Sequence, residues 1–249
     1  MILFRKNAYP IQGYQPIKGG QGSFHSGLAG ALIAVEGIDG SGLSTHSKLL
    51  VKSLESLGLR SVYTKEPTEG PVGKLIRSLL STKGPDPYLM ALLFAADRAW
   101  HLRGDEGLPG GRGVLGALEL NYIVVTDRYK YSSIAYQGSA GAPKEWLWSL
   151  NSFAREADVI VYIDVPVRLA LSRIAARRAV EAYEDEAFLL KVKESFAEVL
   201  ERASEAGVKV IRVPGSVGEE PRPIDDVSKD ILTGVLGWLQ ETQRLNFKS

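Results

Sequence analysis

One stretch near the N-terminus, residues 32–45, constrains the fold more than any other part of the sequence. It reads Leu-Ile-Ala-Val-Glu-Gly-Ile-Asp-Gly-Ser-Gly-Leu-Ser-Thr. An apolar segment comes first, followed directly by a glycine-spaced turn and then by a helical segment with hydroxyl residues near its start. This order predicts a strand, a loop and a helix. Glycine at positions 37, 40 and 42 permits a loop whose N–H groups point inward, at the start of a helix whose dipole attracts anions. We therefore expect this loop to hold a polyphosphate.

The loop matches the phosphate-binding pattern G-x-x-x-x-G-K-[ST] at every defined position except one. Leu43 occupies the lysine position, between Gly42 and Ser44. Ser44 would place its hydroxyl on a phosphate-bridging Mg²⁺, a role that does not require the lysine. The alternative is a glycine-rich turn that binds nothing. The candidate phosphate-binding residues are Gly37, Gly40, Ser41, Gly42, Leu43, Ser44 and Thr45.

The composition indicates one globular domain without disulfides. The chain has 249 residues, 45% of them hydrophobic, and no cysteine, which excludes disulfides and thiolate metal sites. A net charge of +1 gives no reason to expect nucleic acid or a membrane as a partner. No segment has the ~18 consecutive apolar residues of a membrane span. With no such span and no apolar region typical of a secretory signal, we expect a cytoplasmic protein. The three histidines lie far apart in sequence, so we expect no histidine metal site.

The remaining pattern alternates between strands and helices. Residues 1–30 show no sustained period, and we expect an extension there, followed by one domain over residues 31–249. After the strand at Leu32, four more strands are predicted at residues 61–64, 122–126, 159–164 and 208–213. Helices are predicted at 44–57, 72–80, 87–102, from 167 onward and at 224–239, with a glycine-rich loop at 104–113. This order predicts an α/β fold, a three-layer sandwich on a five-stranded parallel sheet.

Charged residues at two places suggest phosphate chemistry. Asp127 and Arg128 follow a predicted strand, where a carboxylate can hold Mg²⁺ and a guanidinium can bind a phosphate. A structural ion pair is the alternative for these two residues. Arg173 and Arg177 are four apart on one predicted helix face, and a solvated face is their alternative.

Several motifs together resemble those of the thymidylate kinase family, over about residues 32–239. Besides the loop, they are Lys-Glu-Pro at 65–67, Leu-Leu-Phe-Ala-Ala-Asp-Arg at 92–98, Asp-Arg-Tyr at 127–129, Tyr-Gln-Gly at 136–138 and Tyr-Glu at 183–184. The resemblance implies an ATP- and Mg²⁺-dependent kinase that converts dTMP to dTDP. It further implies a phosphate-loop nucleotide kinase fold, a small helical lid at about 173–186 and a homodimer.

The resemblance also implies roles for single residues. Phe94 would stack on the thymine, Arg98 would donate to a base carbonyl, and Arg128 would clamp the acceptor phosphate. Asp39 would accept a hydrogen bond from the acceptor sugar or from a metal-bound water. The other implied acceptor-site residues are Glu66, Pro67, Ser133, Tyr136, Gln137 and Tyr183, and the implied metal-side residues are Ser44 and Asp127.

Leu43 departs from the family pattern. Losing one positive donor from a closed site costs about 10² to 10³ in rate. Because Ser41 stands where some members carry a loop arginine, we expect the lid residues Arg173, Arg177 and Arg178 to supply the missing charge. Two other interpretations remain: a nucleotide-binding pseudoenzyme, and a kinase for another pyrimidine monophosphate.

Overall fold

The computed structural model describes residues 29–81, 86–177 and 186–242, the side chain of Arg177 excepted. Its five-stranded sheet is entirely parallel and has the order β2-β3-β1-β4-β5. The strands are β1 (Ala31–Glu36), β2 (Ser61–Lys65), β3 (Ile123–Asp127), β4 (Val159–Asp164) and β5 (Lys209–Pro214). A separate two-stranded antiparallel pair joins β6 (Ser216–Val217) and β7 (Glu220–Pro221). The predicted α/β class and five-stranded parallel sheet are confirmed.

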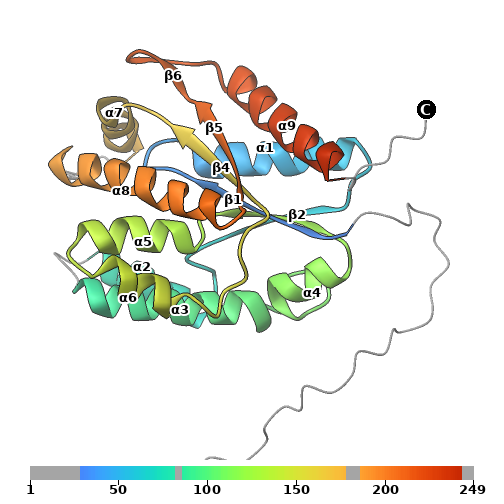
Figure 1. Ribbon diagram of the computed structural model, residues 1–249, viewed down its shortest axis with the longest axis horizontal. Helices are drawn as coiled ribbons and strands as arrows, with labels where there is room; N and C mark the ends of the chain where they lie inside the picture. The colour runs from blue at the N-terminus through green and yellow to red at the C-terminus, as the bar shows by residue number, and fades with distance from the viewer. Residues whose placement is uncertain (1–28, 82–85, 178–185, 243–249) are drawn as a thin grey trace, which may run out of the picture.

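Helices cover both faces of the sheet and complete three layers (Figure 1). The described helices are α1 (Leu43–Ser56), α2 (Pro71–Leu80), α3 (Pro87–Arg103), α4 (Gly113–Glu119), α5 (Lys130–Ser139), α6 (Lys144–Leu150), α7 (Val167–Arg177), α8 (Glu186–Glu205) and α9 (Ile224–Glu241). The helices α1 and α9 pack together on one face, and α3, α4, α5 and α8 lie on the other. None of the helices in the described part has the length and apolar composition that a membrane crossing requires.

The central strands form the core because their sequences are apolar on both faces. All residues of β1 and β3 are buried, as are the first five of β4. Such continuous apolar runs are typical of parallel strands covered by helices on both sides. The carboxyl ends of β1, β2 and β3 meet at one edge, where ligands bind in open α/β sheets.

The predicted element bounds need small corrections. The third strand runs from Ile123 to Asp127, not from 122 to 126, so Asp127 is its last residue and not the first residue of a loop. The fifth begins at Lys209 and ends at Pro214. The helices α4, α5, α6 and α8 and the β6–β7 pair had no counterpart among the predicted elements. The predicted lid falls largely on residues 178–185, outside the described residues.

Candidate active site

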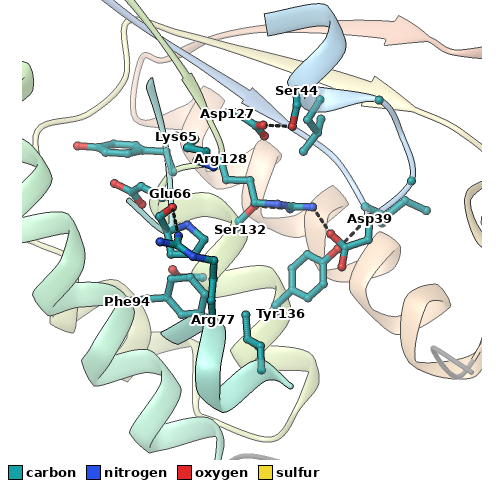
Figure 2. Close-up of a pocket in the computed structure, with 18 of the residues that line it drawn as sticks. Asp39, Ser44, Lys65, Glu66, Arg77, Phe94, Asp127, Arg128, Ser132 and Tyr136 are labelled. Carbon is teal, nitrogen blue, oxygen red and sulfur yellow. Dashed lines mark hydrogen bonds and ion pairs between the residues drawn. The ribbon is translucent and has the colours of Figure 1, made fainter. Parts of the chain in front are cut away.

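A pocket of about 470 Å³ opens at the carboxyl edge of β1, β2 and β3 (Figure 2). Its volume is within the range of small-molecule sites. Most predicted site residues line it, drawn from both the phosphate loop and the acceptor-side motifs. They are Asp39, Gly40, Gly42, Leu43, Ser44, Thr45, Glu66, Pro67, Phe94, Arg98, Asp127, Arg128, Ser133, Tyr136 and Gln137.

The remaining predicted residues lie elsewhere. Gly37 and the buried Ser41 belong to the loop but do not line the pocket. Arg173 approaches the loop from α7, where its Nη1 donates to the Gly40 carbonyl oxygen over 3.2 Å. Arg177 is the last residue of α7 and its side chain is not described. Arg178 and Tyr183 fall outside the described residues.

The phosphate loop has the backbone shape that an anion site needs. Gly40 and Gly42 have φ values of +83° and +95°, a region that favours glycine. A Cβ on Gly40 would lie 2.4 Å from the carbonyl oxygen of Ala170, so only glycine allows the loop to pack against α7. Gly42 is the N-cap of α1 and offers no side-chain cap, which leaves the first N–H groups of the helix available to a phosphate.

Leu43 lines the pocket with a side chain that packs against the core, and it provides no charge. Its side chain is 5% exposed and belongs to the main hydrophobic cluster. The next residue, Ser44, donates its hydroxyl to Asp127 Oδ2. This contact joins the start of α1 to the end of β3 and brings together the two predicted magnesium ligands.

Arg128 connects the phosphate loop with the acceptor side. Its Nη2 forms an ion pair with Asp39, and its Nη1 donates to the Gly37 carbonyl at 3.1 Å and to Ser132 Oγ at 2.9 Å. The guanidinium also lies 5.3 Å from the ring centroid of Tyr136, whose hydroxyl accepts the N–H of Asp39 at 2.8 Å. Both interpretations of Asp127-Arg128 are therefore compatible with this geometry, because the arginine is paired and also faces the pocket.

The backbone of Arg128 is held in a strained conformation. Its φ of +70° is in the left-handed region, which is uncommon for a residue with a side chain. The Arg128 N–H donates to the Val35 carbonyl at 3.0 Å, and Thr126 Oγ1 donates to the Arg128 carbonyl at 2.7 Å. These contacts keep the guanidinium directed at the pocket.

Glu36 supports this turn from the end of β1. Its Oε1 accepts the backbone N–H groups of Tyr129 and Ser132, at 2.9 and 3.2 Å, and its Oε2 accepts the Ser132 hydroxyl. It thereby caps α5, whose N-cap residue Tyr129 makes no side-chain cap of its own. Burial raises the pKa of Glu36 to about 7, although the Ser132 hydrogen bond and the charge of Arg128 act against the rise.

Arg98 is fully buried, and most of its donors are already bonded. Nε and Nη2 donate to Glu66 Oε2 at 2.9 and 2.6 Å, Nη2 also donates to Ser133 Oγ at 2.9 Å, and Nη1 donates to Asn151. A guanidinium carries five N–H groups. Within the described residues, one N–H of Nη1 is left for a ligand.

Glu66 holds Arg98 from the end of β2. Burial alone would raise the pKa of Glu66, but the charge of Arg98 and the hydrogen bond from His101 keep that pKa below its ordinary value. His101 Nδ1 lies 3.0 Å from Glu66 Oε1, and its Nε2 lies 2.7 Å from Thr64 Oγ1. Arg98 is therefore a rigid donor, not a mobile one.

Gln137 lines the pocket one helical turn beyond Ser133 on α5. Its Oε1 is buried and has no hydrogen-bond partner among the described residues. Buried polar atoms are rarely left unpaired, so this oxygen is a candidate ligand contact.

Sequence reasoning missed several residues of this site. Lys65 and Tyr129 belong to motifs quoted above but were given no role, and Ile38 and Ser132 are next to predicted residues, so the motif spacing could have indicated all four. Arg77, Leu80 and Ile174 reach the pocket from helices, and no local pattern marks them. These seven residues complete the pocket lining.

The pKa of Glu36 leads to a prediction about stability. The unfolded carboxyl loses its proton near pH 4.5, whereas the folded one retains it up to about pH 7. The folded state therefore binds more protons in this interval, and its stability falls as the pH rises from about 4.5 to 7, by about 3 kcal/mol. The Glu36→Gln variant should lose this part of the pH dependence. Urea unfolding at pH 5 and pH 8 measures the difference.

The exposed Glu55→Gln variant on α1 is the matched control, and it should keep the pH dependence of the wild type. An identical pH dependence in Glu36→Gln and the wild type would contradict the raised pKa.

Comparison with known proteins gives the family. The family model for thymidylate kinase matches residues 35–221. A protein of Aeropyrum pernix named "Putative thymidylate kinase" is 51% identical over 205 residues, covering 80% of this chain and 93% of that protein. Two proteins named "Probable thymidylate kinase" are also similar. The one from Thermococcus gammatolerans is 36% identical, covering 83% of this chain and 100% of that protein. The one from Pyrobaculum calidifontis is 39% identical, covering 80% and 93%. With a domain match over most of its length and relatives of this similarity, the chain belongs to the thymidylate kinase family.

Proposed function

We propose that this protein transfers the γ-phosphoryl group of ATP to dTMP, forming dTDP and ADP. Membership of the thymidylate kinase family supports the reaction class. The choice of acceptor rests on two polar groups of the pocket that have no hydrogen-bond partner among the described residues, one donor and one acceptor. Within the described residues these are an N–H of Arg98 Nη1 and the buried oxygen Gln137 Oε1.

This pair matches the edge of thymine or uracil. Either base offers O4 as an acceptor for Arg98 and N3–H as a donor for Gln137. Cytosine offers the reverse pattern, an amino donor at position 4 and an acceptor at N3, so its amino group would face the Arg98 donor without an acceptor between them. Phe94 also lines the pocket and provides an aromatic ring for the face of the base.

The acceptor phosphate would bind Arg128, whose forked guanidinium suits a dianionic phosphate. Asp39 would then accept a hydrogen bond from the sugar or from a water. The donor polyphosphate would occupy the loop and the N-terminus of α1. Positioning two phosphates in line and neutralising their charges is the main work of such an enzyme.

The residues present fit a magnesium ion. Ser44 and Asp127 contact each other and offer the oxygen ligands that Mg²⁺ prefers. Among the described residues, no three His, Cys, Asp or Glu side chains come together as a metal site. A Mg²⁺ ion here would be held largely by phosphates and water. Bound there, Mg²⁺ would neutralise the donor phosphates. The homodimer and the cytoplasmic location stay predictions, as do the lid roles of Arg173, Arg177 and Arg178.

Leu43 favours one alternative, a nucleotide-binding protein without turnover. The reason is its burial in the core, which leaves the loop without an ammonium group. Measured turnover with any acceptor would exclude this alternative.

The first test is a coupled ADP-release assay with MgATP and a panel of monophosphates. We expect dTMP to be the best acceptor, dUMP intermediate and UMP poorer. The thymine methyl group adds only ~1 kcal/mol of apolar contact, whereas a ribose 2′-OH would press against Tyr136. The acceptor dCMP should be rejected most strongly. Equal turnover of dTMP and UMP, or of dTMP and dCMP, would contradict this assignment of the pocket.

The second test concerns the acceptor clamp. Arg128→Ala should lower kcat/KM for dTMP by at least ~10²-fold, about 3 kcal/mol, because a charge-assisted phosphate contact is lost. The fold should remain intact, with a Tm close to that of the wild type. The exposed Arg112→Ala variant, which also breaks an ion pair, is the control and should change neither value. A Tm that collapses together with activity would instead support a structural ion pair.

A further inference from the structure

Asn151 bonds Arg98 from outside the pocket. It caps the C-terminal end of α6, is 1% exposed and does not line the pocket. Helix α6 packs beside α3 and α5 (Figure 1), which brings Asn151 to the guanidinium although 53 positions separate the two residues. In the described part of the chain, the other residues that accept from Arg98 are Glu66 and Ser133, and both line the pocket. Asn151 is therefore the partner of Arg98 that a ligand does not reach.

Glu66 alone does not fix the direction of the guanidinium. Both Nε and Nη2 of Arg98 donate to the same carboxylate oxygen, Oε2, at 2.9 and 2.6 Å. The other oxygen, Oε1, is 3.0 Å from His101 Nδ1. An arginine bonded to both oxygens of a carboxylate is locked by two parallel hydrogen bonds, whereas one bonded to a single oxygen can pivot about it. The direction of the Arg98 guanidinium therefore needs a further contact.

Two neighbouring side chains restrict this pivot only in part. Ser133 Oγ accepts from Nη2 at 2.9 Å, but this is the nitrogen that Glu66 already holds, and a hydroxyl oxygen accepts over a broad range of directions. The guanidinium also lies over the ring of Tyr129, with its Cζ 5.5 Å from the ring centroid. The ring opposes movement out of the guanidinium plane but not rotation within it. A contact on Nη1 is the one that can stop this rotation.

Asn151 makes that contact, and its own orientation is fixed. Its Oδ1 accepts a hydrogen bond from Arg98 Nη1, and its Nδ2 donates to the Leu147 carbonyl oxygen at 2.8 Å. Arginine only donates and a carbonyl only accepts, so the two partners together require this orientation of the amide. The backbone N–H of Asn151 donates to the same Leu147 carbonyl at 3.1 Å. The amide is thus anchored to the end of α6.

Fixing one N–H of Nη1 also fixes the other. A guanidinium is planar, and the two N–H bonds of a terminal nitrogen lie in its plane at a set angle. One of them is bonded to Asn151, and the second is the N–H for which the described residues offer no partner. Arg98 lines the pocket together with Phe94. Asn151 therefore determines where in the pocket this second N–H points.

A donor that cannot turn away rejects one base as firmly as it recognises another. The O4 of thymine or uracil would accept from the fixed N–H of Arg98. The 4-amino group of cytosine would face it as a second donor, and relief of this clash requires the guanidinium to pivot. A site built around a fixed, buried hydrogen-bonding group discriminates strongly for this reason.

We propose that Asn151 is a positioning residue that sets the selectivity for thymine over cytosine, by preventing the pivot of Arg98 about Glu66. Asn151 touches neither substrate, and it acts only through the direction of the Arg98 donor. The proposal rests on the proposed dTMP kinase function and names what determines its choice of base.

The test compares dTMP, dUMP and dCMP as acceptors for variants of Asn151. It measures kcat and KM with MgATP, and the Kd of each monophosphate by calorimetry. Asn151→Leu keeps a branched side chain but removes the acceptor. Its preference for dTMP over dCMP should fall by at least about tenfold, mainly through KM, because the guanidinium can now turn away from the cytosine amino group. Its preference for dTMP over dUMP should change by less than about 2-fold, since both bases present O4.

Asn151→Asp is the conservative variant. Like Asn151→Leu, it loses the side-chain donor to Leu147, but it keeps an acceptor for Nη1 of Arg98. Its preference for dTMP over dCMP should stay within about 3-fold of the wild type, whatever happens to its Tm. A merely structural role of Asn151 would affect both variants alike. Where Asn151→Leu does not fold, Asn151→Ala takes its place, because it also lacks an acceptor.

Tyr131→Phe is the matched structural control. Tyr131 is buried on α5 and does not line the pocket. Its hydroxyl donates to Glu156 at 2.7 Å and accepts the N–H of Ala157 at 3.3 Å, in the segment that follows Asn151. This variant should lower Tm and leave the preference for dTMP over dCMP unchanged. A comparable loss of preference in Tyr131→Phe would overturn the proposal, since general loosening of this region would then explain the effect.

Other outcomes separate the proposal from the proposed function. A dTMP-over-dCMP preference in Asn151→Leu within about 3-fold of the wild type would overturn the role of Asn151 and leave the kinase function intact, as would an equal loss in Asn151→Asp. Wild-type protein that binds dTMP in preference to dCMP without turnover would contradict the kinase function, and the Kd ratio of Asn151→Leu would then decide the role of Asn151. Wild-type protein that does not distinguish dTMP from dCMP would overturn both.

Discussion

The site depends on one buried carboxylate at the end of the first strand. Glu36 accepts two backbone N–H groups at the start of α5 and the hydroxyl of Ser132, and Ser132 in turn accepts a hydrogen bond from Arg128. The residue after Glu36 opens the phosphate loop, and Arg128 faces the acceptor side of the pocket. The Glu36 carboxylate thus fixes the position of the phosphate loop relative to the acceptor side of the pocket. Reactions between two phosphates are sensitive to such distances, because small displacements reduce the rate strongly.

Sequence patterns were sufficient to predict the parts of the fold that local rules determine, namely the parallel sheet and the phosphate loop. The apolar runs of β1, β3 and β4 are long enough to be buried on both faces, and they alternate with helical segments, so a parallel sheet was predictable. Because the carboxyl ends of such strands converge, Ser44 and Asp127 could be expected to meet, although 83 positions separate them. The glycine spacing likewise predicted the loop, and the missing lysine was evident from the sequence alone.

Contacts between distant segments could not be predicted in this way. Asn151, at the end of a short helix, bonds the guanidinium of Arg98 across 53 positions, and no motif marks it. Arg98 was expected to be a donor to the base, but most of its donors are bonded to protein groups, because Glu66, the residue after β2, needs a buried counter-charge. The packing of Leu43 into the core was equally hidden, since a residue at the N-terminus of a helix can turn inward or outward. These features depend on tertiary packing, not on local pattern.

The order of strands also determines when the phosphate loop can form during synthesis. In the sheet β1 lies between β3 and β4, so its two edges pair with residues 123–127 and 159–164. The loop residues leave the ribosome before residues 123–164, and their strand has no complete set of partners until residue 164 has been made. During that interval a largely apolar strand and its glycine-rich loop remain unpaired, a state in which chains are open to aggregation and to capture by chaperones. The nucleotide site is thus translated before the strands that support it, so a nascent chain gains affinity for its substrates only when most of its sheet is complete.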